Sequence, residues 1–348
     1  MWCSLRPSRG ISTQKPWRKI NLQPTYFDQP RNDTTMTRTF ETKPATRDQV
    51  PLLIGITSPS GAGKTFSALR IATGIQSVTG GDIAVLDTET RRSLHYADRF
   101  KFMHTEFAAP FSPLDYLAGI EHCYKQGART IVIDSASHEH EGPGGVLEMH
   151  EAEAQRMAEQ WKTSVEKVKL GAWAKPKQDR RRLINTMLQI PCNFILCFRA
   201  KQKLKIEKGK DPQSMGWMPI AGDEWVYEMT MNALLYPNAG GVPTWEPTEP
   251  GEQQMIKLPE QFKPMLLDTH RGKPLSEDIG QALAVWAAGD SAAASEDDAM
   301  DAIVRIRAAA TNAALKKVAE DLRKKGWSVP QREALAAALD ARKSELKG

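Results

Sequence analysis

Short apolar runs alternate with longer amphipathic segments along the chain from residue 50 onward. The apolar runs predict buried strands over residues 52–57, 82–87, 130–134 and 193–198. The segments between them carry apolar residues at helical spacing and predict helices over residues 66–76, 114–125, 147–170 and 180–188. Strands that alternate with helices in this way predict an α/β fold, with a mainly parallel central sheet flanked by helices.

The alternating pattern covers only part of the chain. Residues 1–49 show no apolar period and are rich in Pro, Thr, Arg and Gln, so we expect a disordered extension, with Met36 as an alternative start. The α/β domain should span residues 50–286. Residues 287–300 are rich in Ala, Ser and Asp and predict a linker. Amphipathic segments over residues 301–348 predict a small helical C-terminal module, which we expect to serve interaction rather than chemistry.

The overall composition is that of a globular protein. Hydrophobic residues make up 41% of the chain and charged residues 26%. The longest apolar runs are far shorter than the ~20 residues of a membrane-spanning helix, so we expect no membrane span. The cysteines, which are Cys3, Cys123, Cys192 and Cys197, lack paired CxxC spacing. This argues against a disulfide scaffold and a structural zinc site, and predicts a cytoplasmic protein.

Basic residues gather at three places along the chain. The net charge is +5, from 47 basic and 42 acidic residues, and the first 50 residues account for all of it with 9 basic and 4 acidic residues. One later cluster contains Lys175, Lys177, Arg180, Arg181 and Arg182. Another contains Arg199, Lys201, Lys203, Lys205, Lys208 and Lys210. Such clusters are either solvated faces or sites for an anionic partner, and charge alone leaves both interpretations open.

The strongest chemical signal follows the first predicted strand. The segment consists of Ser58, Pro59, Ser60, Gly61, Ala62, Gly63, Lys64 and Thr65. It matches the phosphate-loop pattern GxxxxGK[ST] except that Ser58 stands at the first glycine. The backbone amides of such a loop and of the helix that follows bind phosphate oxygens. Lys64 should contact the β- and γ-phosphates and Thr65 should offer its hydroxyl to a metal ion, so the segment predicts binding of ATP and Mg²⁺.

Two acidic residues at strand ends are candidates for the remaining chemistry. The run Ile-Val-Ile ends at Asp134, where a carboxylate could hold Mg²⁺ beside the phosphates. The strand over residues 82–87 leads into Asp87-Thr88-Glu89, and an extended backbone would place Asp87 and Glu89 on the same side. We expect Glu89 to orient the attacking water. A solvated loop acid is the alternative for Glu89.

These features resemble the RecA-like branch of P-loop ATPases over roughly residues 50–260. The segment AVLDTET is similar to the RecA element that carries the catalytic glutamate, and IVIDSASH to the strand that carries the metal-binding acid. The segment NFILCFRAKQK resembles the later strand that ends in a γ-phosphate sensor and leads into a DNA-binding loop. RecA has Gln at the sensor, whereas this chain has Arg199 nearby. More narrowly, the chain resembles phage-encoded AAA/RecA-like ATPases, including those of single-strand annealing and recombination.

The resemblance implies a role for the second basic cluster. Lysines that follow phosphates and aromatic rings that stack on bases suit single-stranded DNA, and the candidates are Lys201, Lys203, Lys205, Lys208 and Trp217. Solvated lysines and core aromatic residues are the alternative. Arg199 is the candidate sensor. Arg180 and Arg181, with Arg182 beside them, are candidates for an arginine finger that reaches a neighbouring subunit.

The sequence therefore predicts a DNA-stimulated ATPase with Lys64, Glu89 and Asp134 as its catalytic residues. By the resemblance it acts on single-stranded DNA in phage recombination or replication, as a homo-oligomer in the bacterial cytoplasm. Its C-terminal helices would bind a phage or host recombination or replication protein. Two alternatives stay open, which are a small-molecule kinase on the same loop and a nucleotide-gated adaptor with little turnover.

One further motif is a pair of histidines after Asp134. His138 and His140 alternate with Glu139 and Glu141 in a segment that contains Gly and Pro. This spacing is compatible with a metal site. A His-x-His pair on a flexible loop is more often a set of solvated polar residues.

Overall fold

The computed structural model describes residues 42, 50–289, 296–322, 327 and 329–346. The expected N-terminal extension over residues 1–49, with Met36, thus lies outside the described residues apart from Thr42. Among the helices described, none combines the length and the apolar character that a bilayer crossing requires.

The described residues form one seven-stranded sheet. Its strands are β1 (Leu53–Ser58), β2 (Asp82–Asp87), β3 (Met103–Glu106), β4 (Ala128–Asp134), β5 (Asn193–Lys205), β6 (Gln213–Pro219) and β7 (Met231–Leu234). The order is β3-β2-β4-β5-β1-β7 with parallel pairing throughout, and β6 pairs antiparallel with β5. The predicted α/β fold with a mainly parallel sheet is therefore confirmed.

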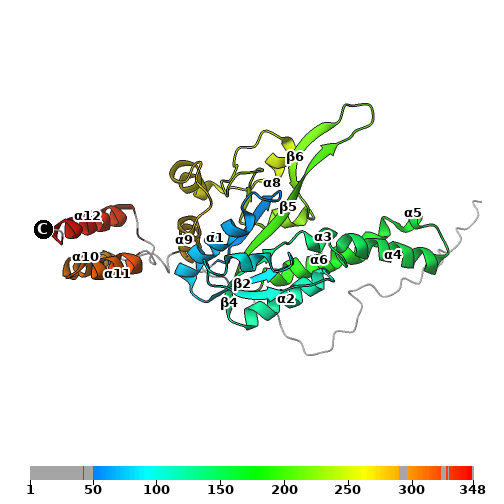
Figure 1. Cartoon of the computed structure of the whole chain (residues 1–348). Coiled ribbons are helices and arrows are strands. Elements are labelled where there is room, and N and C mark those ends of the chain that lie inside the picture. Colours follow the sequence, from blue (N-terminus) through cyan, green and yellow to red (C-terminus); the bar gives the residue numbers. More distant parts are fainter. Residues whose placement is uncertain (1–41, 43–49, 290–295, 323–326, 328, 347–348) are drawn as a thin grey trace, which may run out of the picture. The chain divides into compact units, whose positions relative to one another are not determined.

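Helices connect the strands and cover the sheet (Figure 1). The longer ones are α1 (Lys64–Thr79), α2 (Pro113–Lys125), α4 (Val146–Trp161), α6 (Ala174–Met187) and α9 (Glu277–Ala288). Shorter helical turns are η1 (Arg92–Tyr96), α3 (His138–Glu141), α5 (Val165–Val168), η2 (Gly171–Trp173), α7 (Glu224–Glu228), α8 (Pro250–Met255), η3 (Glu260–Phe262) and η4 (Pro264–Thr269).

The single helix predicted over residues 147–170 is wrong. The structure divides this stretch because Lys162 takes a left-handed backbone conformation with φ of 48° and ends α4. The amide of Lys162 bonds back to the carbonyl of Glu159, and the following residues begin the short helix α5. A polar stretch of this kind carries no strong stop signal, so its helical period alone did not locate the break.

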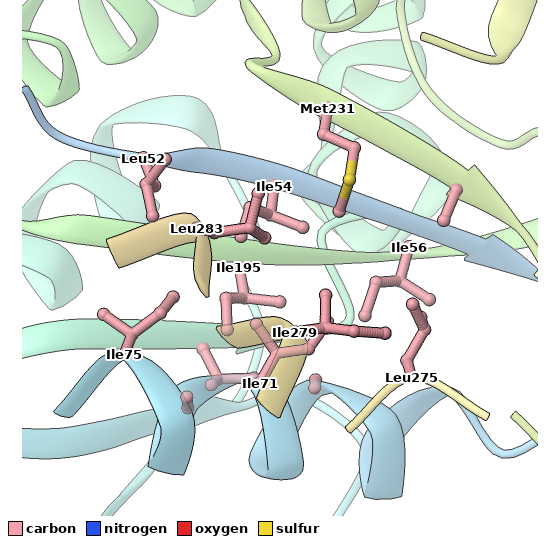
Figure 2. Close-up of a cluster of buried hydrophobic side chains, with 14 of the residues drawn as sticks. Leu52, Ile54, Ile56, Ile71, Ile75, Ile195, Met231, Leu275, Ile279 and Leu283 are labelled. Atoms are coloured by element: carbon pink, nitrogen blue, oxygen red, sulfur yellow. The ribbon is translucent and has the colours of Figure 1, made fainter. Parts of the chain in front are cut away.

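The hydrophobic core has one layer on each face of the sheet, because successive residues of a strand point to opposite faces. On one face, Ile54 and Ile56 of β1 pack with Ile71 of α1 and Leu283 of α9 (Figure 2). Leu53 of β1 belongs instead to the second core, which contains residues of α2 and α6. Both faces of β1 are thus buried. This packing holds the last residue of the strand, Ser58, in position.

The C-terminal residues form three helices, α10 (Glu296–Ala308), α11 (Asn312–Leu322) and α12 (Val329–Glu345). They enclose a small core of their own, which includes Ile306, Leu315 and Leu335. The linker predicted over residues 287–300 overlaps the end of α9 and the start of α10, and residues 290–295 lie outside the described residues.

Candidate nucleotide-binding site

The loop between β1 and α1 is built by two glycines with left-handed backbones. Gly61 has φ of 79° and Gly63 has φ of 93°, conformations that favour glycine. The backbone of Gly241 lies only 3.0 Å from where a Cβ of Gly63 would be, and its amide donates to the carbonyl of Ala62 over 3.0 Å. The loop is therefore supported from outside, with the amino end of α1 at its base, as a phosphate-binding loop requires.

Ser58 replaces the first glycine of the loop pattern without disturbing the backbone. It is the last residue of β1, pairs with Arg199 of β5 and is buried. A strand conformation accepts any side chain, so this position does not need glycine. Its hydroxyl has no hydrogen-bond partner among the described residues.

Asp134 lies beside the end of this loop, although β5 separates β4 from β1 in the sheet. Its side chain is 4% exposed, and Lys64 Nζ lies 3.5 Å from Oδ1. The hydroxyl of Thr65 donates to Oδ2. Burial raises the pKa of Asp134 above its usual value, although Lys64 and Thr65 act to lower it.

The pair of Thr65 and Asp134 suits a hard divalent cation. Asp134 Oδ1 is buried and accepts no hydrogen bond from the described residues, so it keeps electron pairs for a ligand. Carboxylate and hydroxyl oxygens are the donors that Mg²⁺ prefers, and it commonly takes few protein ligands together with substrate phosphates. The donor set therefore fits Mg²⁺ accompanied by a nucleotide.

The loop after β2 places Asp87 and Glu89 in different surroundings. Asp87 is buried and accepts hydrogen bonds from the backbone amides of Glu89 (2.8 Å) and Ser93 (3.0 Å). Thr90 and Arg91 turn the chain, with φ of 57° and 66°. The backbone therefore does not stay extended as the sequence analysis assumed. Asp87 holds the loop together, and Glu89 lines the cavity above the phosphate loop.

Two guanidinium groups flank Glu89. Arg199 Nε donates to its Oε1 over 2.8 Å, and Arg92 Nη1 lies 3.3 Å from its Oε2. The side chain of Glu89 is 8% exposed. Burial would raise the pKa of Glu89, but the hydrogen bond and charge of Arg199 and the charge of Lys64 outweigh it and lower the pKa. Glu89 is therefore a carboxylate at neutral pH, and its low exposure and its two arginine contacts correct the alternative of a solvated loop acid.

One cavity of about 700 Å³ collects these groups. It is lined by the phosphate loop, Lys64, Thr65, Glu89, Asp134 and Arg199. Arg92 also lines the cavity, although it was not among the residues predicted from the sequence. The one sequence signal for Arg92 was the Arg91-Arg92 pair, which follows Glu89 after Thr90 in a loop whose turn depends on Asp87.

Comparison with known families agrees with this geometry. A family model described as an AAA domain matches residues 51–233, which is more than half of the chain. The chain belongs to this family of P-loop ATPases. No curated protein matches it. The AAA domain match begins just before β1 and ends within β7, so it includes the phosphate loop, Glu89, Asp134 and Arg199.

Within the AAA domain, β5 continues beyond Arg199 and forms an antiparallel hairpin with β6 (Figure 1). Lys201, Lys203 and Lys205 occupy alternate positions after Arg199, so they share one face of this β5–β6 hairpin. Trp217 is paired with Gln202 and therefore lies on the other face. The prediction that Trp217 joins these lysines in one binding surface is therefore wrong, because the ring lies on the opposite face of the hairpin. Lys208 is an exposed residue of the loop that connects β5 to β6.

The expected arginine fingers of the AAA domain have contrasting environments. Arg180 is 4% exposed, and its Nε and Nη2 each donate to the carboxylate of Glu139 over 2.9 Å. Its Nη1 lies 3.4 Å from Glu224. Arg180 is thus engaged inside its own subunit, which does not favour a finger at this position. Arg181 and Arg182 are exposed on α6.

The histidine pair lies on the short helix α3 rather than on a flexible loop. His140 Nδ1 is 2.9 Å from Arg180 Nη2, and burial together with the charge of Arg180 lowers the pKa of His140 to about 4. His138 Nδ1 is 2.7 Å from the hydroxyl of Thr88. The described residues contain no group of three or more His, Cys, Asp or Glu side chains that could hold a metal ion.

Proposed function

We propose that the AAA domain hydrolyses ATP with Mg²⁺ held at Thr65 and Asp134, and that single-stranded DNA bound to the β5–β6 hairpin stimulates the hydrolysis. One observation carries the proposal. A phosphate loop, a pair of oxygen ligands suited to Mg²⁺ and a buried carboxylate between two arginines line the same cavity. Phosphoryl transfer needs this combination of positioning and charge neutralisation.

The residues divide the work of hydrolysis between them. The loop amides and Lys64 bind the triphosphate, so Lys64 exchanges its contact with Asp134 for the phosphates. Mg²⁺ bound at Thr65 and Asp134 would neutralise charge on the phosphate oxygens. Arg199 and Arg92 face the same cavity, and their remaining N–H groups can bind the γ-phosphate while both arginines keep their contacts with Glu89. Glu89 orients the attacking water.

The hairpin supports the DNA part of the proposal. Its lysine face continues directly from Arg199, so one strand carries both a cavity residue and the candidate DNA contacts. Ala200 of β5 and Ile220, which follows β6, line the cavity, so the base of the hairpin forms part of the nucleotide site. Lysines at alternate positions on one face of a strand suit a phosphate backbone. A strand shared by both sites supports coupling of DNA binding to turnover.

The assembly belongs to the same proposal. Arg181 and Arg182 are exposed on α6 and available to a second subunit, which supports a homo-oligomer. The C-terminal module has a core of its own, which supports binding of a separate recombination or replication protein. The phage context follows from the resemblance to phage ATPases.

The experiment is ATP turnover with and without single-stranded DNA across a salt series. We expect wild-type turnover to rise with DNA and the stimulation to fade as salt increases, because released counterions drive binding to phosphates. Lys64→Ala should lose turnover under all conditions. Lys201→Ala combined with Lys205→Ala should lose the stimulation by DNA.

Lys125→Ala is the matched control, since Lys125 is an exposed lysine on α2 paired with Glu121. It should behave as wild type. Stimulation that is indifferent to salt, or that survives in the hairpin variant, would contradict DNA binding by the hairpin. Full turnover by Lys64→Ala would contradict the nucleotide site itself.

A further inference from the structure

A second, smaller cavity adjoins Glu89. It has a volume of about 340 Å³ and is lined by Thr88, Glu89, Thr90, Arg92, His138 and Arg199. Glu89, Arg92 and Arg199 also line the nucleotide cavity. We call this space the side chamber. Glu89 therefore lies on the boundary between the nucleotide cavity and the side chamber, and besides Glu89 and the two arginines the titratable group of the side chamber is His138.

Thr88 anchors one ring nitrogen of His138. The Thr88 hydroxyl accepts from the amide of Ser135 (2.8 Å) and lies within donating distance of the Ser135 carbonyl (3.1 Å). The Ser135 carbonyl also accepts from the Tyr116 hydroxyl over 2.7 Å, so the one hydrogen of Thr88 can lie toward Ser135 or toward His138 Nδ1, which is 2.7 Å away. In the first arrangement, His138 Nδ1 is the donor. Nε2 of the neutral ring then carries the free electron pair.

The surroundings keep this ring neutral and in place. His138 stacks on Phe111, with 5.0 Å between the ring centroids and 26° between the planes. Burial and the charge of Arg199 lower the pKa of His138, although Glu89 and Glu141 act to raise it. Nε2 has no hydrogen-bond partner among the described residues, and the ring lines the side chamber.

Glu89 by itself is a weak proton acceptor. Its two oxygens are engaged by Arg199 and Arg92, and those contacts favour the carboxylate form. General-base catalysis works best when the acceptor has a pKa near the working pH. A neutral imidazole meets that condition better than a carboxylate held between two guanidinium groups.

We propose that His138 is a further catalytic residue of the AAA domain, with Nε2 accepting a proton from the attacking water that Glu89 orients. The inference rests on the proposed ATP hydrolysis. The water oxygen forms a bond to the γ-phosphorus while the bond to the bridging oxygen breaks, and ADP leaves with that electron pair. The proton of the water passes to His138 Nε2, where the carboxylate of Glu89 stabilises the imidazolium. His138 then returns the proton to the released phosphate or to solvent.

Three substitutions separate this role from a structural one. His138→Gln places an amide oxygen near the position of Nε2, so it can still orient the water. His138→Asn reaches only the position of Nδ1, so it keeps the contact with Thr88. His138→Phe keeps the stacking on Phe111 and removes both nitrogens. ATP affinity and single-turnover hydrolysis would be measured for each variant, together with thermal unfolding.

We expect all three variants to bind ATP as wild type does. Single-turnover hydrolysis by His138→Asn and His138→Phe should fall by about 100-fold, the size expected for loss of a general base. His138→Gln should recover part of the rate. If His138→Asn kept its activity and His138→Gln lost it, His138 would act through its contact with Thr88, and the inference would be overturned. Wild-type rates in all three variants, or loss of ATP binding in all three, would overturn it as well.

The control separates this inference from the proposed function. Wild-type protein that binds ATP without hydrolysing it would refute the proposed hydrolysis, and this inference with it. A fully active His138→Phe in a hydrolysing protein would refute only the role of His138.

Discussion

Asp87 and Glu89 lie two positions apart and do different work. The buried carboxylate of Asp87 accepts hydrogen bonds from backbone amides of its own loop, whereas Glu89 lines the nucleotide cavity. The hydrogen bonds of Asp87 hold the turn that positions Glu89. Arg180 has a comparable structural role, since its contacts with Glu139 and Glu224 join α6 to α3 and α7. At the residue scale, the cavity therefore depends on buried ionic groups that do not face it.

The lowered pKa of His140 predicts that the free energy of unfolding depends on pH. Its pKa of about 4 in the folded protein lies below the value near 6.5 of an unfolded chain, so the unfolded state binds more protons between these values. Folding stability should therefore decrease as the pH falls from about 6.5 to about 4, by about 1 kcal/mol once solvent screening of a half-buried group is allowed for. Denaturant unfolding at several pH values measures this.

His140→Asn is the matched variant, because its amide oxygen can still accept from Arg180 but does not titrate. The variant should lose less stability than wild type across the same pH interval. Identical pH profiles for the two proteins would contradict the assignment.

The sequence could anticipate the cavity residues that lie in a local pattern or at a strand end. Lys64 and Thr65 belong to a contiguous motif, and Asp134 ends an apolar strand, so their proximity follows from the parallel sheet. The positions of Arg92 and His138 depend on a turn held by Asp87 and on contacts with Thr88. The burial of Arg180 depends on Glu139, 41 positions earlier. Such long-range contacts leave no local signal.

Among the elements, α1 and α9 show how the fold supports the phosphate loop. They approach so closely that a Cβ on Gly74 would lie 2.0 Å from the carbonyl oxygen of Glu277. Arg70 donates twice to the carboxylate of Glu277, with its Nε 2.9 Å and its Nη2 2.6 Å from Oε2. Helix α9 thus holds α1, whose amino end forms the base of the loop, from a position about 200 residues later in the chain.

Gly74→Ala should therefore destabilise the protein. A methyl group improves helix propensity by about 1 kcal/mol, but the clash is with backbone atoms, and overpacking costs about 1–3 kcal/mol. The clash should win, so we expect a lower free energy of unfolding. Ser77→Ala on the exposed side of the same helix should change it by no more than about 0.5 kcal/mol. A Gly74→Ala protein at least as stable as wild type would show that the two helices are not in contact as described.

At the element scale, periodicity predicted the central strands but not the edge strand β3 or the outer part of β5. The strands β1, β2, β4 and the first half of β5 are continuous apolar runs because both of their faces are covered. Strand β3 has the sequence MHTE, with no buried residue to mark it. The outer half of β5 is polar and exposed, and its strand conformation comes from pairing with β6.

At the scale of the whole molecule, β5 is the element that connects the nucleotide cavity with the β5–β6 hairpin. It lies between the strand that carries the phosphate loop and the strand that carries Asp134. It brings Arg199 to Glu89 and then leaves the sheet to form the hairpin. A nucleotide that draws Arg199 toward its γ-phosphate would act directly on the strand that carries the lysines. The central claim remains that this cavity hydrolyses ATP with Glu89 beside the phosphates.

The most direct test is to measure ATP affinity and single-turnover hydrolysis for Glu89→Gln with Mg²⁺. We predict unchanged or tighter ATP binding, because the cavity loses a negative charge, and a rate lower by about 100-fold or more, because the water loses its carboxylate. Glu106→Gln, an exposed acid at the end of β3, should match wild type in both measurements. Hydrolysis by Glu89→Gln at the wild-type rate would contradict the account.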